Sequence, residues 1–337
     1  MRAAVLAEDR PRLELVELDT PVPAEGEVLV RVTGCGICGS DLHLASQLAA
    51  PGTVLGHEIA GEVAELGPGV DAGMWRVGTP VAVRPFAGCG TCASCRSGRA
   101  DHCATFQLLG MQRPGGFAEL VAAQADELFT LPAAVAADEQ PLVEPLAIVR
   151  HALRRGDVGP ADRVAVLGAG PIGLATVAWA RALGIATIAV SEPSALRRDL
   201  ARRLGATAAL DPSGGDVAAA LAEAVGGPPT VVVECSGRPG LLEEAIELAA
   251  VDARVVVVGI CPDYDRIFPL WAIGKELDLR FSVYYGRDDF TETVTALDAH
   301  RLEVLPMVTE TVGLEALPER FGRLERDADA GKVLVRP

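Results

Sequence analysis

Valine-rich segments that alternate with helical patterns constrain the fold of this chain more than any other feature. Downstream of Glu144, runs such as Val-Val-Val and Val-Val-Val-Val predict strands covered on both faces, as in a parallel sheet. We expect strands at residues 163–167, 186–190, 230–235, 253–258 and 279–285, and helices at residues 171–183, 195–204 and 241–250. This alternation predicts a doubly wound α/β domain.

The chain before Glu144 has a different texture. Short alternating stretches between Gly and Pro turns, such as residues 28–32, 56–67 and 80–83, predict a strand-rich domain. Near the other end, residues 291–300 predict a helix, and residues 331–337 predict a strand that returns to the first domain. We therefore expect a strand-rich domain over residues 1–148, a doubly wound domain over 149–286 and a returning segment over 287–337.

A glycine-rich motif indicates where a dinucleotide would bind. Gly168, Gly170 and Gly173 form a G-x-G-x-x-G that includes Pro171 and Ile172. The motif is weak alone, but here it follows a predicted strand and opens a predicted helix, which is the context it requires. The first glycine allows the tight turn, the second leaves room for pyrophosphate, and the third lets helix and strand pack closely. The helix N-terminus then offers N–H groups to the phosphates.

Glu192 ends the next predicted strand. A carboxylate there accepts hydrogen bonds from the ribose hydroxyls and repels a 2′-phosphate, which favours NAD over NADP. Arg197 follows five residues later. It is either a neighbour of the adenine or ribose or a solvated helix charge.

Four closely spaced cysteines predict a structural zinc site. Cys89, Cys92, Cys95 and Cys103 follow a C-x2-C-x2-C-x7-C pattern and are flanked by small residues, including Gly88, Gly90, Ser94 and Gly98. Tetrahedral zinc takes four thiolates, and a tight loop can supply them. A disulfide pair or chance clustering is the alternative.

A second set of ligand-type residues lies outside that run. Cys38, His57 and Glu58 offer a thiolate, an imidazole and a carboxylate, and Glu144 adds a carboxylate near the expected domain junction. Three protein ligands with one open position are typical of a catalytic zinc site. Taken singly, His57 is also compatible with a packed structural histidine. We interpret Cys35, Cys235 and Cys261 as ordinary thiols.

Bulk properties exclude several functions. The formal net charge of −16 disfavours binding to a nucleic-acid backbone. No apolar run approaches the roughly 18 residues of a membrane span, and the first ten residues lack the pattern of a signal peptide. Eight cysteines suit metal thiolates in a reducing compartment, so we expect a cytoplasmic protein.

Taken together, the motifs resemble the zinc-dependent medium-chain dehydrogenase/reductase family, the alcohol dehydrogenase superfamily. The resemblance covers essentially the whole length. It rests on G-I-C-G-S-D-L-H at 36–43, G-H-E at 56–58, the cysteine lobe at 89–103, V-E-P-L at 143–146 and G-A-G-P-I-G at 168–173. It implies a GroES-like catalytic domain followed by a Rossmann domain. Because Glu144 stands where classical alcohol dehydrogenases have cysteine, the chain is most similar to the polyol, butanediol and threonine branch.

The resemblance also implies roles for single residues. Cys38, His57 and a glutamate, either Glu58 or Glu144, would hold a catalytic zinc, and Asp41 would orient His57. Ser40 and His43 match the family's proton relay, in which the proton passes from the substrate hydroxyl through Ser40, the cofactor ribose and His43 to solvent. Ile148 and Ile172 match positions that pack on the nicotinamide, although both also suit a plain core.

The expected function is hydride transfer between a secondary alcohol or polyol and NAD, with two zinc ions per chain. The alternatives are an NAD(P)H-dependent ketone or aldehyde reductase, a non-catalytic dinucleotide-binding protein, and a zinc-free enone or quinone reductase. Only twelve residues separate His43 from Gly56, a loop that walls the substrate pocket in the family, so the substrate stays open. We expect a homodimer or homotetramer, with the edge strand at residues 279–285 as the place of association.

Overall fold

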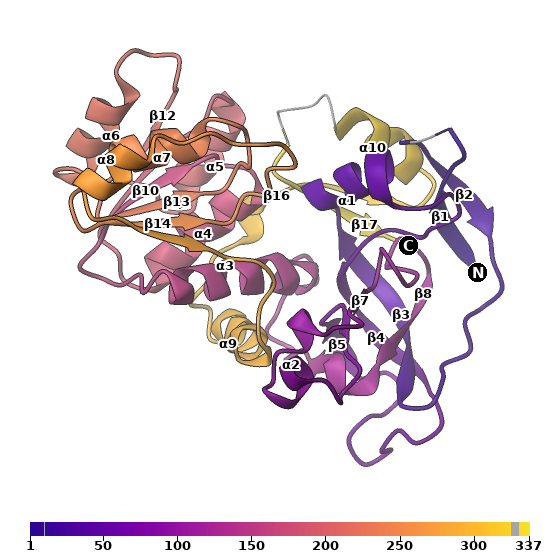
Figure 1. The fold of residues 1–337 in the computed structure, drawn as a ribbon. Coiled ribbons are helices and arrows are strands. Elements are labelled where there is room, and N and C mark those ends of the chain that lie inside the picture. Colours follow the sequence, from indigo (N-terminus) through magenta and orange to yellow (C-terminus); the bar gives the residue numbers. More distant parts are fainter. Residues whose placement is uncertain (10, 325–329) are drawn as a thin grey trace.

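The computed structural model describes residues 1–9, 11–324 and 330–337. Two units, each built around its own sheet, are connected through the long helix α3 (Val143–Arg155) (Figure 1). Indigo and yellow segments lie together in one unit, because the C-terminal strand β17 (Lys332–Arg336) pairs antiparallel with β3 (Glu27–Gly36). Residues from both ends of the chain therefore build the same sheet.

The unit that we call the parallel-sheet domain has six strands in the order β12-β11-β10-β13-β14-β15. They are β10 (Arg163–Leu167), β11 (Thr187–Ser191), β12 (Ala208–Leu210), β13 (Val231–Glu234), β14 (Arg254–Val257) and β15 (Asp278–Phe281). All neighbours are parallel. The strand order reverses at β10, and ligands of such sheets bind at this switch point.

Helices cover both faces of this sheet, as the continuous apolar strands predict. Val164 and Val166 belong to the core cluster that contains residues of α3 and α4, whereas Ala165 and Leu167 pack in a separate cluster with residues of α6 and α7. The helices are α4 (Pro171–Ala182), α5 (Ala195–Arg203), α6 (Val217–Val225), α7 (Leu241–Leu248), α8 (Pro269–Gly274) and α9 (Arg287–Asp298). The predicted doubly wound α/β fold is confirmed.

One predicted strand is shorter than expected. The segment at residues 279–285 is strand only through Phe281, where β15 ends. Tyr284 has a φ of 56°, in the left-handed region that an extended strand cannot contain. The chain therefore leaves the sheet before Tyr285 and turns toward α9.

The second unit, the strand-rich domain, contains a seven-stranded sheet in the order β16-β17-β3-β4-β5-β9, with β8 also paired to β3. The remaining strands are β4 (Glu58–Leu66), β5 (Pro80–Val83), β8 (Leu120–Gln124), β9 (Leu128–Thr130) and β16 (Val308–Gly313). Strands β1 (Arg2–Leu6) and β2 (Leu13–Glu17) form a separate pair, as do β6 (Phe86–Ala87) and β7 (Gln107–Leu108).

Short helical segments punctuate the strand-rich domain. They are α1 (Gly39–His43), the π-helical turn Leu44–Leu48, α2 (Ala93–Arg96), α10 (Leu317–Leu324) and the 3-10 turns Ala100–His102, Ala125–Glu127 and Gln140–Leu142. A further 3-10 turn, Leu305–Met307, contacts α4 and α5 of the parallel-sheet domain. None of the helices in the described part of the chain is long and apolar enough to cross a membrane.

Candidate functional site

Cys38, His57 and Glu58 come together at the start of two elements. Cys38 precedes α1, and Glu58 opens β4 directly after His57. One ligand atom from each of the three lies within 4.8 Å of the other two. Gly56 makes the turn into β4 with a φ of 91°, and a Cβ there would lie 2.6 Å from the ring of Phe117. The position therefore requires glycine.

Asp41 holds two members of this set. Its Oδ2 accepts a hydrogen bond from the backbone N–H of Cys38 at 2.9 Å, and its Oδ1 lies 3.2 Å from Nδ1 of His57. Burial by itself lowers the pKa of His57, but the charge of Asp41 and hydrogen bonds with Asp41 and Cys38 outweigh it and raise the pKa well above its usual value. A carboxylate on one ring nitrogen leaves the other nitrogen available to a metal.

Glu58 is bound by a lysine that comes from the C-terminal strand. Nζ of Lys332 lies 2.5 Å and 2.7 Å from the two carboxylate oxygens of Glu58, and it also donates to the carbonyl of Ile37 at 3.1 Å. Both side chains are about 1% exposed. Burial lowers the pKa of Lys332, but the charge of Glu58 more than offsets this and raises it. A Cβ on Gly36 would lie 1.7 Å from Oε2 of Glu58, so this glycine makes room for the carboxylate.

Glu144 lies in the first turn of α3 and outside the three-residue set. Its Oε1 accepts a hydrogen bond from the hydroxyl of Tyr285 at 2.8 Å, and both residues are buried. Burial raises the pKa of Glu144 to about 7, helped by the charge of Glu58 and opposed by His57 and by the hydrogen bond from Tyr285. The charged centre at Glu58 and His57 is therefore close enough for Glu144 to respond to it.

The two residues assigned to the proton relay lie on α1. Ser40 is half-buried and His43 is exposed, so the short helix leads from the ligand set toward solvent. The helix continues as the π-helical turn Leu44–Leu48, a form that is frequent at functional sites. Ile148 on α3 and Ile172 on α4 are partly buried against the core of the parallel-sheet domain.

The four lobe cysteines also converge. One sulfur from each lies within 4.8 Å of the others, and all eight cysteines of the chain are free. The backbone N–H groups of Cys89, Cys92 and Cys95 donate to lobe sulfurs at 3.2–3.4 Å. Hydrogen bonds, first from the side chain of Thr91, lower the pKa of Cys89 to about 5, whereas burial raises that of Cys95 to about 12.

The lobe combines a cysteine whose pKa is lowered with one whose pKa is raised, and this combination suits a bound cation and not a disulfide. The backbone donors around the sulfurs stabilise thiolates, yet four clustered negative charges repel one another. Burial, which raises the pKa of Cys95, keeps that thiol protonated, and a divalent ion would neutralise the remaining thiolates. The donor set of four sulfurs is the one that zinc takes in structural sites.

The glycine motif has the geometry that a bound pyrophosphate needs. Gly168 turns the chain with a φ of 90° between β10 and α4. A Cβ on Gly170 would meet no atom within 4 Å, whereas a Cβ on Gly173 would lie 1.9 Å from the carbonyl oxygen of Gly168. The second glycine therefore faces open space, and the third permits the close approach of helix and strand. Pro171 is the first residue of α4, where its missing N–H costs nothing.

Glu192 is tied to this turn. Its two carboxylate oxygens accept hydrogen bonds from the backbone N–H groups of Ala169 at 2.7 Å and Ser194 at 2.9 Å. Arg197 turns toward the other domain, where its Nε donates to the carbonyl of Ala330 at 2.9 Å. Arg198 donates to the carbonyl of Glu192 at 2.8 Å.

Comparisons with known proteins agree with this geometry. Residues 24–133 match the alcohol dehydrogenase GroES-like domain, and residues 171–299 match the zinc-binding dehydrogenase domain. An L-threonine 3-dehydrogenase from Pyrococcus horikoshii is 36% identical over 331 residues, which covers 95% of this chain and 94% of the relative. The chain belongs to the zinc-dependent medium-chain dehydrogenases.

Two solved structures of this dehydrogenase family carry different cofactors. RspB from Escherichia coli, in complex with NADH, is 30% identical with a TM-score of 0.92, and the match covers 100% of this chain and 99% of RspB. A zinc-binding dehydrogenase from Sinorhizobium meliloti, bound to NADP, is 32% identical with the same TM-score and the same coverage. This medium-chain dehydrogenase is accordingly an oxidoreductase that uses a nicotinamide dinucleotide.

Two residues of the dehydrogenase site were missed in the sequence. Lys332 and Tyr285 bind the two candidate glutamates, yet they lie 274 and 141 positions away from them. A lysine that opens the apolar strand Lys-Val-Leu-Val is a usable signal, because a buried charge needs a partner. Tyr285 gave no such signal, since it stood in a segment interpreted as strand.

Proposed function

We propose that this dehydrogenase oxidises a secondary alcohol or polyol with NAD, and that Cys38, His57 and Glu58 hold its catalytic zinc. The convergence of a half-buried thiol with a buried imidazole and a buried carboxylate, with Asp41 behind the imidazole, carries the proposal. A zinc ion held there polarises the substrate oxygen and lowers the pKa of the hydroxyl. The substrate class follows the resemblance to the polyol and threonine branch.

Within this proposal the protein's own groups move the proton and position the reactants. Ser40 accepts the hydroxyl proton, and His43 passes it to solvent from the exposed end of α1. Gly168, Gly170 and Gly173 place the pyrophosphate at the N-terminus of α4. Ile148 and Ile172 form the apolar surface for the nicotinamide. Cys89, Cys92, Cys95 and Cys103 hold the second zinc, which stabilises the lobe.

The preference for NAD rests on Glu192. Its carboxylate is fixed beside the glycine turn by Ala169 and Ser194, so it cannot withdraw from a 2′-phosphate. A buried carboxylate and a phosphate repel each other strongly in such surroundings. The NADP-bound relative is the reason to test both cofactors side by side.

We further propose a homodimer formed through β15. This strand pairs with β14 on one side, and its other edge is the end of the sheet. Exposed apolar side chains gather on β15, the turn after it and α8; they are Phe281, Val283, Leu270, Trp271 and Ile273. An uncovered edge flanked by apolar groups suits a second copy of the same chain.

We also propose that the protein is cytoplasmic and that its domain boundaries lie at residues 148 and 286.

A substrate panel with a metal count tests the function. Diols, polyols, hydroxy-amino acids and simple secondary alcohols are assayed by NADH absorbance, and metals are counted per chain. We expect two zinc ions per chain, turnover with at least one member of the panel, and one zinc with no turnover for Cys38→Ala. One zinc in the unaltered protein, with no turnover, would instead support a non-catalytic dinucleotide-binding protein.

A further inference from the structure

Several contacts hold the segment around Tyr285 where the two domains meet. The carbonyl of Tyr285 accepts a hydrogen bond from Nη2 of the buried Arg84 at 3.4 Å. Its ring packs against Phe290, with centroids 5.7 Å apart and planes at 24°, and against Phe86 at 5.1 Å. The side chain is fully buried. The hydroxyl of Tyr285 therefore has a fixed place.

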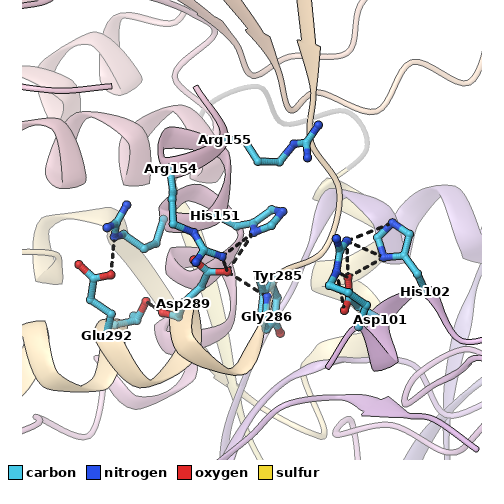
Figure 2. Close-up of polar contacts among 12 residues, drawn as sticks. Asp101, His102, His151, Arg154, Arg155, Tyr285, Gly286, Asp289 and Glu292 are labelled. Atoms are coloured by element: carbon cyan, nitrogen blue, oxygen red, sulfur yellow. Dashed lines mark hydrogen bonds and ion pairs between the residues drawn. The ribbon is translucent and has the colours of Figure 1, made fainter. Parts of the chain in front are cut away.

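The residue after Tyr285 connects the same segment to α3 through Asp289. The N–H of Gly286 donates to Oδ2 of Asp289 at 2.9 Å, and the same oxygen lies 2.9 Å from Nδ1 of His151 and 2.8 Å from Nη2 of Arg154. Figure 2 shows this cluster between α3 and α9, with Tyr285 next to it. Glu144 and His151 are on one helix. Tyr285 contacts Glu144 and Asp289 contacts His151, so α3 is held at two points.

These contacts decide where the carboxylate of Glu144 can go. The hydroxyl of Tyr285 donates to Oε1 of Glu144 at 2.8 Å in a buried setting, where a hydrogen bond to a carboxylate is strong. Among the described residues, the ligand atoms that converge within 4.8 Å include Glu58 but not Glu144. Two carboxylates thus lie near one metal position, and only one of them is in place to bind.

We propose that Tyr285 is a positioning residue that keeps Glu144 out of the coordination shell of the catalytic metal. The inference rests on the proposed function, because it needs a metal at Cys38, His57 and Glu58. With the hydroxyl in place, Glu144 stays bonded to Tyr285 and the metal keeps an open position for substrate. Without the hydroxyl, the freed carboxylate takes that position. Activity then falls because the substrate oxygen has no place to bind.

Cobalt(II) in place of zinc tests this directly, because its visible absorption reports the coordination of the metal. Tyr285→Phe removes one hydroxyl and keeps the ring packing. We expect its catalytic-site absorption to change relative to the unaltered protein, its release of that metal to a chelator to slow about tenfold, and kcat to fall at least tenfold. Tyr284→Phe removes a neighbouring hydroxyl and is the matched control, with an unchanged spectrum. Cys38→Ala supplies the spectrum of the lobe site alone.

The double variant Tyr285→Phe/Glu144→Gln removes the freed carboxylate. We expect its absorption and metal release to return to those of the unaltered protein. Glu144→Gln alone, with Tyr285 present, should keep the parental spectrum, which gives a reading even if Tyr285→Phe folds poorly. An altered spectrum in Glu144→Gln alone would overturn the proposal, as would a parental spectrum in Tyr285→Phe, faster metal release in Tyr285→Phe, or a double variant that does not revert. If the unaltered protein binds no metal that Cys38→Ala removes, the proposed function itself fails.

Discussion

Lys332 donates to both carboxylate oxygens of Glu58 in a pocket from which solvent is excluded. The lysine neutralises one of the two carboxylates at the candidate metal centre, and its Nζ is also anchored on the carbonyl of Ile37. Glu144 has a neutral donor instead, the hydroxyl of Tyr285. The two acids of the site therefore have different partners, and this difference suits them to different roles.

Breaking the Lys332–Glu58 pair should destabilise the protein strongly. Lys332→Met leaves an unpaired buried carboxylate, which costs about 3–5 kcal/mol in comparable cases. We expect a clear fall in the thermal midpoint of the metal-free protein, measured by circular dichroism. The double variant Lys332→Met/Glu58→Gln removes the stranded charge and should recover most of the loss. A double variant as unstable as the single one would contradict this reasoning.

Glu144 should make the stability of the metal-free protein depend on pH. Its pKa is raised in the fold to about 7 from an ordinary value near 4.5, so the folded protein binds this proton more tightly than the unfolded chain. The stabilisation is complete below the unfolded pKa and is lost as pH rises toward 7. Glu144→Gln removes the effect. The thermal midpoint of this variant, relative to that of the unaltered protein, should therefore rise as pH increases from 5 to 8. The gain corresponds to about 2–3 kcal/mol at most. A constant difference across that range would argue against a buried acid.

The cysteine lobe should lose its metal independently of the catalytic site. Cys92→Ala removes one of four sulfurs, and we expect zinc content to fall by one ion per chain while the Cys38 site keeps its own. Limited proteolysis should then cut within residues 89–103, because the lobe has little regular structure besides α2 and one 3-10 turn. Cys261→Ala, outside both ligand sets, is the control with unchanged metal content. Equal zinc content in Cys92→Ala and the control would refute a structural zinc.

Glu192 should govern the choice between NAD and NADP at a cost in stability. Glu192→Ala removes the charge that repels a 2′-phosphate, so kcat/KM with NADP should rise relative to that with NAD. It also leaves the N–H groups of Ala169 and Ser194 without their acceptor, which costs about 1–3 kcal/mol. Steady-state kinetics with both cofactors give the ratio. Asp199→Asn, an exposed charge on α5, should leave the ratio unchanged.

The β15 edge should hold two copies together. Phe281→Glu places a charge on an exposed apolar position of the edge strand, and we expect light scattering to report monomers at concentrations where the unaltered chain is a dimer. Val22→Glu, at a still more exposed apolar position of the strand-rich domain, is the control. Identical masses for both variants would place the interface elsewhere.

The sequence was most informative where residues that are neighbours along the chain are enough to identify a structural feature. The valine runs predicted β13 and β14 because a strand buried on both faces needs no partner identity to be recognised. The cysteine spacing likewise predicted that the four sulfurs converge in one loop. Helix α3 was overlooked, since Pro145 disguises a helix although proline is tolerated in a first turn.

The supports of the site could not be predicted in the same way. Tyr285 and Lys332 reach Glu144 and Glu58 only after the chain has passed through the parallel-sheet domain. Neither pairing follows a local period, and the Lys332–Glu58 pair depends on the return of β17 to the sheet that contains β3 and β4. The left-handed turn at Tyr284 adds to this, because its backbone angle contradicts the extended pattern of the apolar letters around it.

The 274 positions between Glu58 and Lys332 also impose an order on biosynthesis. At about 5–20 residues per second, a ribosome needs roughly 14–55 s to deliver the lysine after the glutamate has been made. During that interval the nascent strand-rich domain lacks both its neighbouring strand β17 and the counter-charge for an acid that it has to bury. The first domain to be synthesised is therefore the last to be finished.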